Sequence, residues 1–337
     1  MNSTSDRNNY CTLFDSNYLH KGLALYTSLT SLNENFHLYV LAFDDKCYTE
    51  LNSLNLVNLT AISLSEFETQ ELKEVKPTRN RAEYCWTCGP SVIYHFITNY
   101  HLNHCTYLDA DMMFYSSTKP IYNEIGDNSI AITEHFTEDH IEGRFCVQFV
   151  YFKNDENGIQ ALIWWKNKCI EWCYAKYEDG KFGDQKYLDY FPSLFKKVHV
   201  IKHRGAGVAP WNTMLYTFSE FGKLEYNKQL IDIIFFHYHG TRINLIENEL
   251  VISFITFDVK NEEEKFLYLP YLNLLKSIYK IYFNIDVSSL RLEKRSKLMR
   301  FYFKLKRISR HNPMIQFMYY KILKIKYNGY EKNSLCI

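Results

Sequence analysis

The segment Tyr107-Leu-Asp109-Ala-Asp111-Met-Met-Phe-Tyr115 contains two carboxylates. They follow the apolar run Cys105–Leu108, which has the length and composition of a buried strand. Residues i and i+2 of an extended chain point to the same side, so Asp109 and Asp111 can share one face. Two neighbouring carboxylates repel each other unless a cation or a proton lies between them. A hard divalent ion that also holds a diphosphate is therefore expected there. Because Asp-x-Asp also occurs in solvated turns, its context has to decide between these interpretations.

Strands and helices alternate along the first part of the chain. The expected strands are Thr12–Asp15, Phe36–Phe43, Leu59–Leu64 and Cys105–Leu108. The expected helices are Leu23–Leu29, Tyr48–Leu54 and Pro90–Tyr100, the last with its proline in the first turn. This alternation predicts an α/β fold with a mixed, mostly parallel sheet and helices on both faces. Ligands of such folds bind at the carboxyl ends of the strands, which is where Asp109 and Asp111 lie.

The second half continues this pattern and then changes character. Further strands are expected at Ile130–Thr133, Val147–Phe152 and Leu230–Phe236, and helices at Ile159–Tyr174 and from Gly183. From about Glu262 onward the chain is expected to be helical, aromatic and basic.

Composition and targeting signals indicate a globular intracellular chain. Hydrophobic residues make up 47% of the 337 residues and charged residues 23%. The polar start Met1-Asn-Ser-Thr-Ser-Asp6 lacks the plan of a signal peptide, and no apolar run has the length of a membrane span. The nine Cys have no framework spacing, which favours reduced, mostly buried thiols and a cytoplasmic location.

The net charge of +1 conceals an acidic body and a basic tail. Residues 291–337 contain 13 Lys or Arg and 2 acidic residues. Apolar residues recur with helical spacing within residues 291–326, at Leu298, Phe301, Tyr302 and Leu305. A basic amphipathic helix predicts peripheral attachment to an anionic membrane surface, on the inner face of the cell membrane. The alternative is a helix packed on the body, and nucleic acid is not expected because no binding motif accompanies the charge.

Four short motifs, read in order, are more specific than any one of them. They are Tyr107-Leu-Asp-Ala-Asp111, Asp184-Gln185-Lys-Tyr-Leu188, Gly207-Val-Ala-Pro-Trp211-Asn212 and Phe236-His237-Tyr-His239-Gly240. Over roughly residues 10–245 the chain resembles a bacterial GT-A glycosyltransferase related to family 8. The resemblance implies a Rossmann-like catalytic domain at 1–260 and a basic aromatic helical extension at 261–337.

The resemblance also implies a reaction. Such enzymes move a sugar from a nucleotide-diphosphate donor to a glycan or lipid-linked acceptor, here expected to be a hexosyl transfer in polysaccharide biosynthesis with retention of configuration. In the family, the Asp-x-Asp carboxylates and a late His hold Mn²⁺, for which Mg²⁺ can substitute. Asp109, Asp111 and His237 are therefore the implied metal ligands, and the spacing leaves His239 as an alternative to His237.

The late family motif His-x-x-Gly-x-x-Lys is matched only in part. His237 and Gly240 match, but Ile243 occupies the position of the lysine. Arg242 is the nearest cation, and it is the residue that we expect at the donor phosphates.

Asp184 and Gln185 resemble the Asp-Gln pair that reaches the reacting sugar in this family and are the implied catalytic residues. An Asp at a helix start is also an ordinary N-cap, and both roles can hold together. In retaining relatives the neighbouring amide is thought to stabilise an oxocarbenium-like centre, which is electrostatic stabilisation where charge develops.

Other residues near expected strand ends are weaker candidates for donor or acceptor contacts. Asp15 follows the first strand, where the family places a residue near the nucleotide base. Arg79 and Arg81 are candidates for the diphosphate or donor sugar, with a solvated loop as the alternative. Glu134 or His135 is a candidate for the acceptor, because the pair ends a strand.

Two features point to other classes of function. Cys146-Val-Gln148 stands where the family usually has Asn-x-Gly, which makes a non-catalytic surface- or glycan-binding protein the second hypothesis. Cys85-Trp-Thr-Cys88 permits a thiol oxidoreductase as the third. Two buried thiols are the favoured interpretation of that motif, because a redox motif should open a helix in a different layout.

Overall fold

The computed structural model describes residues 7–137, 142–254, 257 and 259–293. The chain forms two compact units, Met1–Tyr238 and His239–Ile337. The predicted membrane-binding stripe lies outside the described residues, and both that role and the division of the chain at residue 260 stay predictions. Among the described residues, no helix combines the length and the apolar character needed to cross a membrane.

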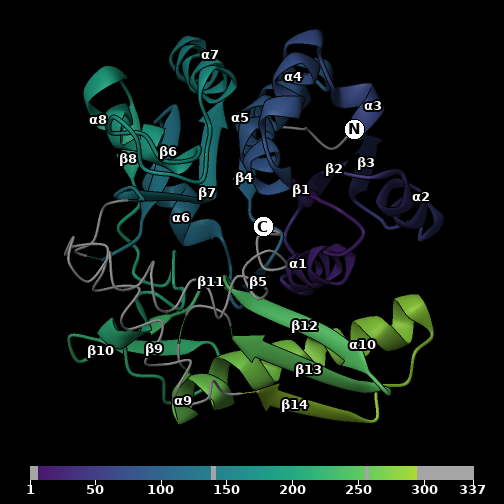
Figure 1. Cartoon of the computed structure of the whole chain (residues 1–337). Helices are drawn as coiled ribbons and strands as arrows, with labels where there is room; N and C mark the ends of the chain where they lie inside the picture. The colour runs from purple at the N-terminus through teal and green to yellow at the C-terminus, as the bar shows by residue number, and fades with distance from the viewer. Residues whose placement is uncertain (1–6, 138–141, 255–256, 258, 294–337) are drawn as a thin grey trace, which may run out of the picture. The chain divides into compact units, whose positions relative to one another are not determined.

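The first unit is built on a seven-stranded sheet with the order β3-β2-β1-β4-β7-β6-β8 (Figure 1). The neighbours β3, β2, β1 and β4 are parallel, as are β6 and β8, whereas β7 runs antiparallel to both β4 and β6. The strands are β1 (Asn8–Phe14), β2 (Phe36–Ala42), β3 (Leu59–Ser63), β4 (His104–Leu108), β6 (Ile130–Glu134), β7 (Phe145–Lys153) and β8 (Val198–Val200). The mixed, mostly parallel α/β sheet predicted from the sequence is therefore confirmed.

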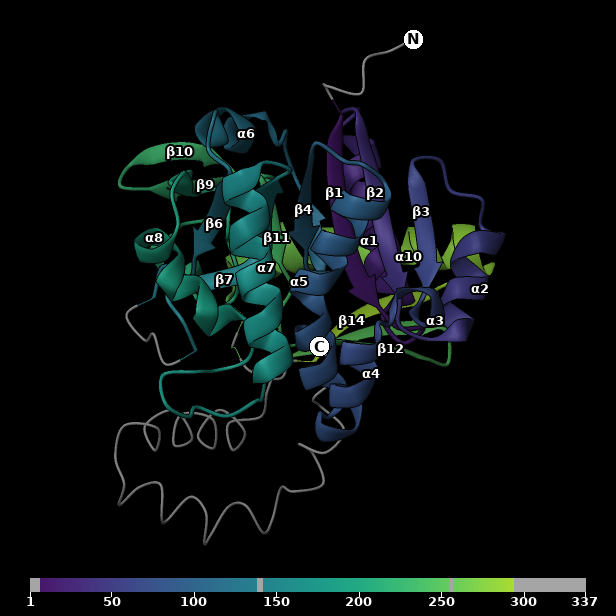
Figure 2. The same cartoon turned by 90° about the horizontal axis from the view of Figure 1, so that it is seen from above.

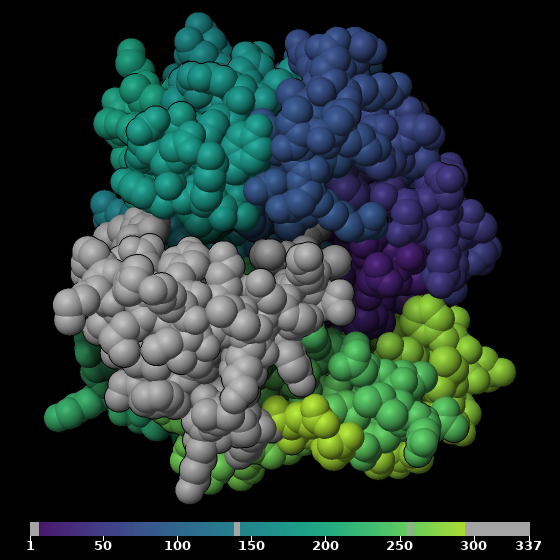
Figure 3. Space-filling view, in the orientation of Figure 1, coloured from purple at the N-terminus to yellow at the C-terminus, as the bar shows by residue number. Residues whose placement is uncertain are grey.

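Helices cover the sheet on both faces. Helices α5 (Arg81–Asn99) and α7 (Glu156–Glu171) lie side by side on one face, and α1 (Leu19–Ser31) lies on the other (Figures 1 and 2). In the space-filling view, side chains close the space between the segments that hold α5 and α7 (Figure 3). The remaining helices of this unit are α2 (Asp45–Ser53), α3 (Leu64–Phe67), α4 (Gln70–Val75), α6 (Lys119–Ile125) and α8 (Phe191–Leu194), with a 3₁₀ helix at Gln185–Tyr190.

Helix α5 begins earlier than the sequence pattern predicted. A capping box at Asn80 and Glu83 satisfies the first backbone N–H groups, so the helix starts at Arg81. Pro90, which was expected in the first turn, is therefore buried in the middle of the helix. That prediction was wrong because the N-cap residue Asn80 lies ten residues before the proline.

Two short strand pairs complete the first unit. The predicted strand Leu230–Phe236 is in fact divided between β10 (Gln229–Asp232), which pairs with β9 (Lys223–Tyr226), and β11 (Phe235–His237). Strand β11 runs antiparallel to β5 (Met112–Phe114), which directly follows the Asp-x-Asp segment. This pairing fixes the position of the last motif relative to the first.

The second unit contains strands as well as helices. Strand β12 (Thr241–Ile246) pairs with β13 (Glu249–Phe254), which also pairs in parallel with β14 (Ser289–Glu293). Between them lie α9 (Asn261–Glu263), a π-helical stretch at Glu264–Tyr268 and α10 (Leu269–Phe283). The expectation of helix alone beyond residue 262 was wrong at β14, where polar and leucine residues alternate with the period of a strand.

Helix α7 approaches the end of β7 so closely that only glycine fits at position 158, in the first turn of the helix. A Cβ atom on Gly158 would lie 2.1 Å from the backbone oxygen of Lys153. Gly158→Ala should therefore lower the free energy of unfolding by about 1–3 kcal/mol, the usual cost of overpacking. Urea unfolding measures this, with Gln160→Ala on the exposed face of the same helix as the control, expected within about 0.5 kcal/mol of wild type. Equal stability of the two variants would contradict the close approach.

Candidate metal and donor site

The direction of β7 places its first residues in the centre of the site. Because β7 is antiparallel to β4, its first residues lie beside the carboxyl end of β4, and the N–H of Asp109 donates to the carbonyl of Gln148 at 3.3 Å. On the other side, β11 pairs with β5 so that His237 is opposite Met112. Three segments far apart in sequence therefore meet at the carboxyl end of β4.

The structure brings the three predicted metal ligands together. The Nε2 atom of His237 lies 2.9 Å from Oδ1 of Asp111 and 3.6 Å from Oδ2 of Asp109. Asp111 and His237 are only 5% and 4% exposed, so these charged groups interact in a poorly solvated environment. An imidazole nitrogen facing two carboxylates is a donor set that suits a divalent ion.

Two neighbours hold the His237 ring in place. Its Nδ1 lies 3.0 Å from Oε1 of Gln148, so Nδ1–H donates to the amide oxygen and Nε2 is left facing the carboxylates. Trp211 packs edge-on against the ring, with centroids 5.3 Å apart. Partners of this kind fix the tautomer and orientation of metal-binding histidines. Gln148 therefore has a defined structural role beside His237.

Lys21 is a member of the site that sequence reasoning missed. It lies on α1, is only 3% exposed, and its Nζ is 3.7 Å from Oδ2 of Asp111 and 4.0 Å from the centre of the Tyr18 ring. Burial lowers the pKa of Lys21, and Asp111 opposes that shift. The sequence signal that could have found it is a lysine two residues before the expected helix Leu23–Leu29.

The pKa values of Asp109 and His237 depend on burial and on the charges that these groups place on each other. Burial raises the pKa of Asp109 to about 6, with Asp111 adding to the rise and His237 opposing it. For His237, burial disfavours the charged form, but Asp111 and Asp109 outweigh it and raise the pKa. A divalent cation would relieve both effects, so the residues present fit such an ion.

Asp184 lies near this centre, close enough for Asp109 to affect its pKa. It precedes the 3₁₀ helix at Gln185–Tyr190, and its backbone carbonyl accepts from Nε1 of buried Trp165 at 2.9 Å. Asp184 occupies the N-cap position of that helix, as expected, but its side chain makes no capping hydrogen bond there. Burial, followed by the charge of Asp109, raises the pKa of Asp184 to about 8. The role of Gln185 stays a prediction.

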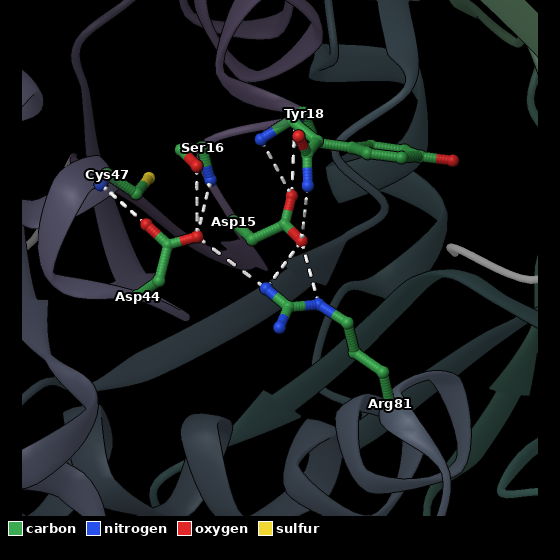
Figure 4. Close-up of polar contacts among 7 residues, drawn as sticks. Asp15, Ser16, Tyr18, Asp44, Cys47 and Arg81 are labelled. Atoms are coloured by element: carbon green, nitrogen blue, oxygen red, sulfur yellow. Dashed lines mark hydrogen bonds and ion pairs between the residues drawn. The ribbon is translucent and has the colours of Figure 1, made fainter.

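Asp15 and Arg81 form an ion-pair cluster at the carboxyl ends of β1 and β2 (Figure 4). The Nε of Arg81 donates to Oδ2 of Asp15 at 2.8 Å, and a terminal nitrogen lies 3.6 Å from Oδ2 of Asp44. The same Asp44 oxygen accepts from the backbone N–H and hydroxyl of Ser16. In this structure Arg81 thus bridges two carboxylates, while donor binding by Asp15 and Arg81 stays a prediction.

Arg79 and the Glu134–His135 pair have structural contacts. The Arg79 guanidinium stacks 3.9 Å above the Tyr174 ring and donates to the carbonyl of Ile170 near the end of α7. Glu134 forms an ion pair with Arg144, and the His135 carbonyl accepts from Trp211 and Asn212 side chains. These contacts neither assign nor remove the predicted ligand roles.

Gly240, Arg242 and the alternative ligand His239 belong to the second unit, so their proposed roles also stay predictions. Gly240 has φ +70°, a conformation that favours glycine, which explains the residue type at this turn.

Cys85 and Cys88 are buried in the middle of α5 rather than at a helix start. Burial raises the pKa of Cys88, whereas reactive thiols are partly exposed and have lowered pKa values. The structure thus matches the expected pair of buried thiols.

Comparison with known proteins identifies a relative in Bacillus subtilis. No protein-family profile matches it. It is 32% identical over 247 residues to YfnF of Bacillus subtilis (strain 168), an uncharacterized protein, covering 69% of this chain and 82% of YfnF.

Solved structures give weaker likenesses. The galactosyltransferase LgtC, in complex with donor and acceptor sugar analogs, has a TM-score of 0.44 and 13% identity, covering 69% of this chain and 87% of LgtC. The bifunctional glycosyltransferase WbbM, in its apo form, has a TM-score of 0.48 and 13% identity, covering 84% of this chain and 52% of WbbM.

The raised pKa of Asp184 predicts a pH-dependent cost of burying its charge. Between the usual value of 3.8 and about 8, the folded protein binds more protons at this group than the unfolded chain, so stability falls as pH rises. Relative to Asp184→Asn, the metal-free wild type should lose up to about 1.4 kcal/mol per pH unit across this window, with no further loss above it.

Urea unfolding at pH 5, 6.5 and 8 in the presence of a chelator measures the difference. Asp179→Asn is the matched control, because Asp179 is exposed and has a positive φ that asparagine also adopts. A stability difference between Asp184→Asn and wild type that is constant with pH would show that Asp184 is not the group responsible.

Proposed function

This chain belongs to the protein family of YfnF, and we propose that it is a metal-dependent glycosyltransferase acting on a nucleotide-diphosphate sugar. The observation that carries the proposal is the meeting of Asp109, Asp111 and His237 at the carboxyl end of β4. A solvated Asp-x-Asp turn would leave both carboxylates exposed and would need no histidine facing them. The acceptor is proposed to be a glycan or a lipid-linked glycan in polysaccharide biosynthesis.

The donor set supports Mn²⁺ or Mg²⁺ as the cofactor. Asp109, Asp111 and His237 would hold the ion, and the pKa of Asp109, raised to about 6 by burial and by the nearby Asp111, supports a cation beside it. When bound, the ion would act as a Lewis acid that stabilises the leaving diphosphate. Gln148 supports this arrangement by keeping Nδ1 of His237 as the donor and Nε2 toward the carboxylates.

Asp184 and Gln185 are proposed to contact the donor sugar. Asp184 is buried near Asp109, so it is close enough to the centre to interact with its charges. Gln185, the next residue, begins the 3₁₀ helix. An amide dipole held beside the anomeric carbon would stabilise the positive charge that develops there in a retaining hexosyl transfer.

The nucleoside and diphosphate contacts are proposed on the same basis. Asp15 would contact the nucleoside end of the donor from the carboxyl end of β1, and its partner Arg81, or Arg79, would contact the diphosphate or the donor sugar. Gly240 and Arg242 would contact the phosphates, with Arg242 taking the part of the family lysine. The proposed location is the cytoplasm, with peripheral attachment to the inner membrane face through the basic tail.

A binding protein without activity remains the second candidate, since Cys146 and Gln148 depart from the family pattern. Donor hydrolysis in the presence of Mn²⁺ separates the two, because a binding protein would retain donor affinity without turnover.

Metal-dependent donor binding is the first test. A panel of nucleotide sugars with Mn²⁺ should contain at least one member that raises the melting temperature, because a ligand specific for the native state stabilises it. His237→Ala should weaken Mn²⁺ binding by at least about tenfold. The control is His199→Ala, which removes a histidine paired with Glu124 at 3.0 Å on β8 and α6. Stabilisation that is independent of metal, or unchanged in His237→Ala, would contradict the proposed centre.

Gln185→Ala tests the catalytic assignment. We expect turnover to fall by about 10²–10³-fold with donor affinity nearly unchanged, because the lost interaction belongs to the transition state. Steady-state kinetics and donor titration measure the two effects, with Gln160→Ala on the exposed face of α7 as the control. An equal loss of binding and turnover would make Gln185 a ground-state contact instead.

A further inference from the structure

Cys146 and Gln148 stand at the start of β7 and are the two residues that depart from the family pattern. Gln148 contacts His237 directly, with its Oε1 3.0 Å from Nδ1 of the imidazole. Cys146 is 3% exposed, and its thiol is close enough to Asp109 for that carboxylate to contribute to its raised pKa, after burial. Both departures therefore face the same centre rather than the exterior.

The Cys146 sulfur is placed like a metal ligand. Its Sγ, a carboxylate oxygen of Asp109 and a ring nitrogen of His237 all lie within 4.8 Å of one another. In the described part of the chain, this is the group of three His, Cys, Asp or Glu side chains whose ligand atoms all lie within 4.8 Å of one another. A tetrahedral ion bound at about 2.0–2.3 Å separates its ligands by roughly 3.3–3.8 Å, so only small side-chain adjustments are needed.

The chemistry of the three atoms differs from that of an all-oxygen site. One sulfur, one imidazole nitrogen and one carboxylate oxygen form a mixed set that suits borderline ions such as Zn²⁺ and Co²⁺. Mn²⁺ and Mg²⁺ gain little from a thiolate, because they favour oxygen ligands. The buried thiol would release its proton to solvent when the ion binds, as metal-binding cysteines do.

We propose that Cys146 is a thiolate ligand of the divalent ion at this centre, together with Asp109 and His237. The centre then binds Zn²⁺ and Co²⁺ more tightly than a site of oxygen and nitrogen ligands alone. This inference rests on the metal dependence in the proposed function, and it adds a ligand and an ion preference to it. Gln148 is the accompanying positioning residue, because its amide oxygen keeps Nε2 of His237 directed toward the carboxylates.

Cobalt binding to the full-length protein, freed of metal with a chelator, tests the ligand directly. Wild type should show visible d–d bands and a near-ultraviolet thiolate-to-cobalt charge-transfer band. Cys146→Ser should keep the d–d bands but lose the charge-transfer band, and its Zn²⁺ affinity should fall at least tenfold while its Mn²⁺ affinity changes less than threefold. Cys146→Ala provides a second variant, because a serine hydroxyl can itself bind a cation.

Cys105→Ser is the matched control, since Cys105 is a buried β4 thiol whose neighbour is Cys11. A charge-transfer band that survives in both Cys146 variants, or d–d bands without any charge-transfer band in wild type, would overturn the thiolate ligand and leave the proposed function intact. A wild-type protein that binds no cobalt and no Mn²⁺ would overturn the metal centre itself. Thermal unfolding of each variant shows whether a lost band reflects a lost ligand or a lost fold.

Discussion

The burial of Asp111 and the partial burial of Asp109, at the end of one strand, are the constraint on which the rest of the site depends. Removing a carboxylate from water costs several kcal/mol unless positive charge or hydrogen bonds compensate for it. Here His237 faces both Asp109 and Asp111, and Lys21 approaches Asp111 from α1. Even so, the pKa of Asp109 is raised to about 6, so the compensation supplied by the chain is incomplete. That deficit is the physical argument for a cation at this place.

One reversal of strand direction accounts for the neighbours of these carboxylates. Had β7 been parallel to β4, its first residues would lie beside the amino end of β4. Because it is antiparallel, Cys146 and Gln148 lie beside the end of β4, where Gln148 orients His237. The two residues that stand where the resemblance led us to expect Asn-x-Gly thus lie directly at the centre. It changes the chemistry of the site without changing how the sheet is built.

Local signals predicted the elements well wherever hydrophobic runs and caps were close together. The four parallel strands and the alternation of strand and helix followed from apolar runs of four to eight residues. Two errors have a local physical cause. Pro90 was given the role of a helix start although the capping box at Asn80 lies earlier in the chain, and Leu230–Phe236 was read as one strand although its halves pair with different partners. Strand breaks of this kind depend on pairing, which a single run of residues does not encode.

The sequence by itself determined the α/β class and placed Asp109 and Asp111 at a strand end, because side-chain alternation and apolar length are local properties. It also singled out His237 and Asp184 as candidate site residues, but only because the order of the motifs resembles that of a known family. The tertiary structure alone decided that Lys21, Cys146 and Gln148 belong to the same centre. Their proximity follows from the packing of α1 and from the direction of β7, and neither has a signature in the residues that are adjacent along the chain.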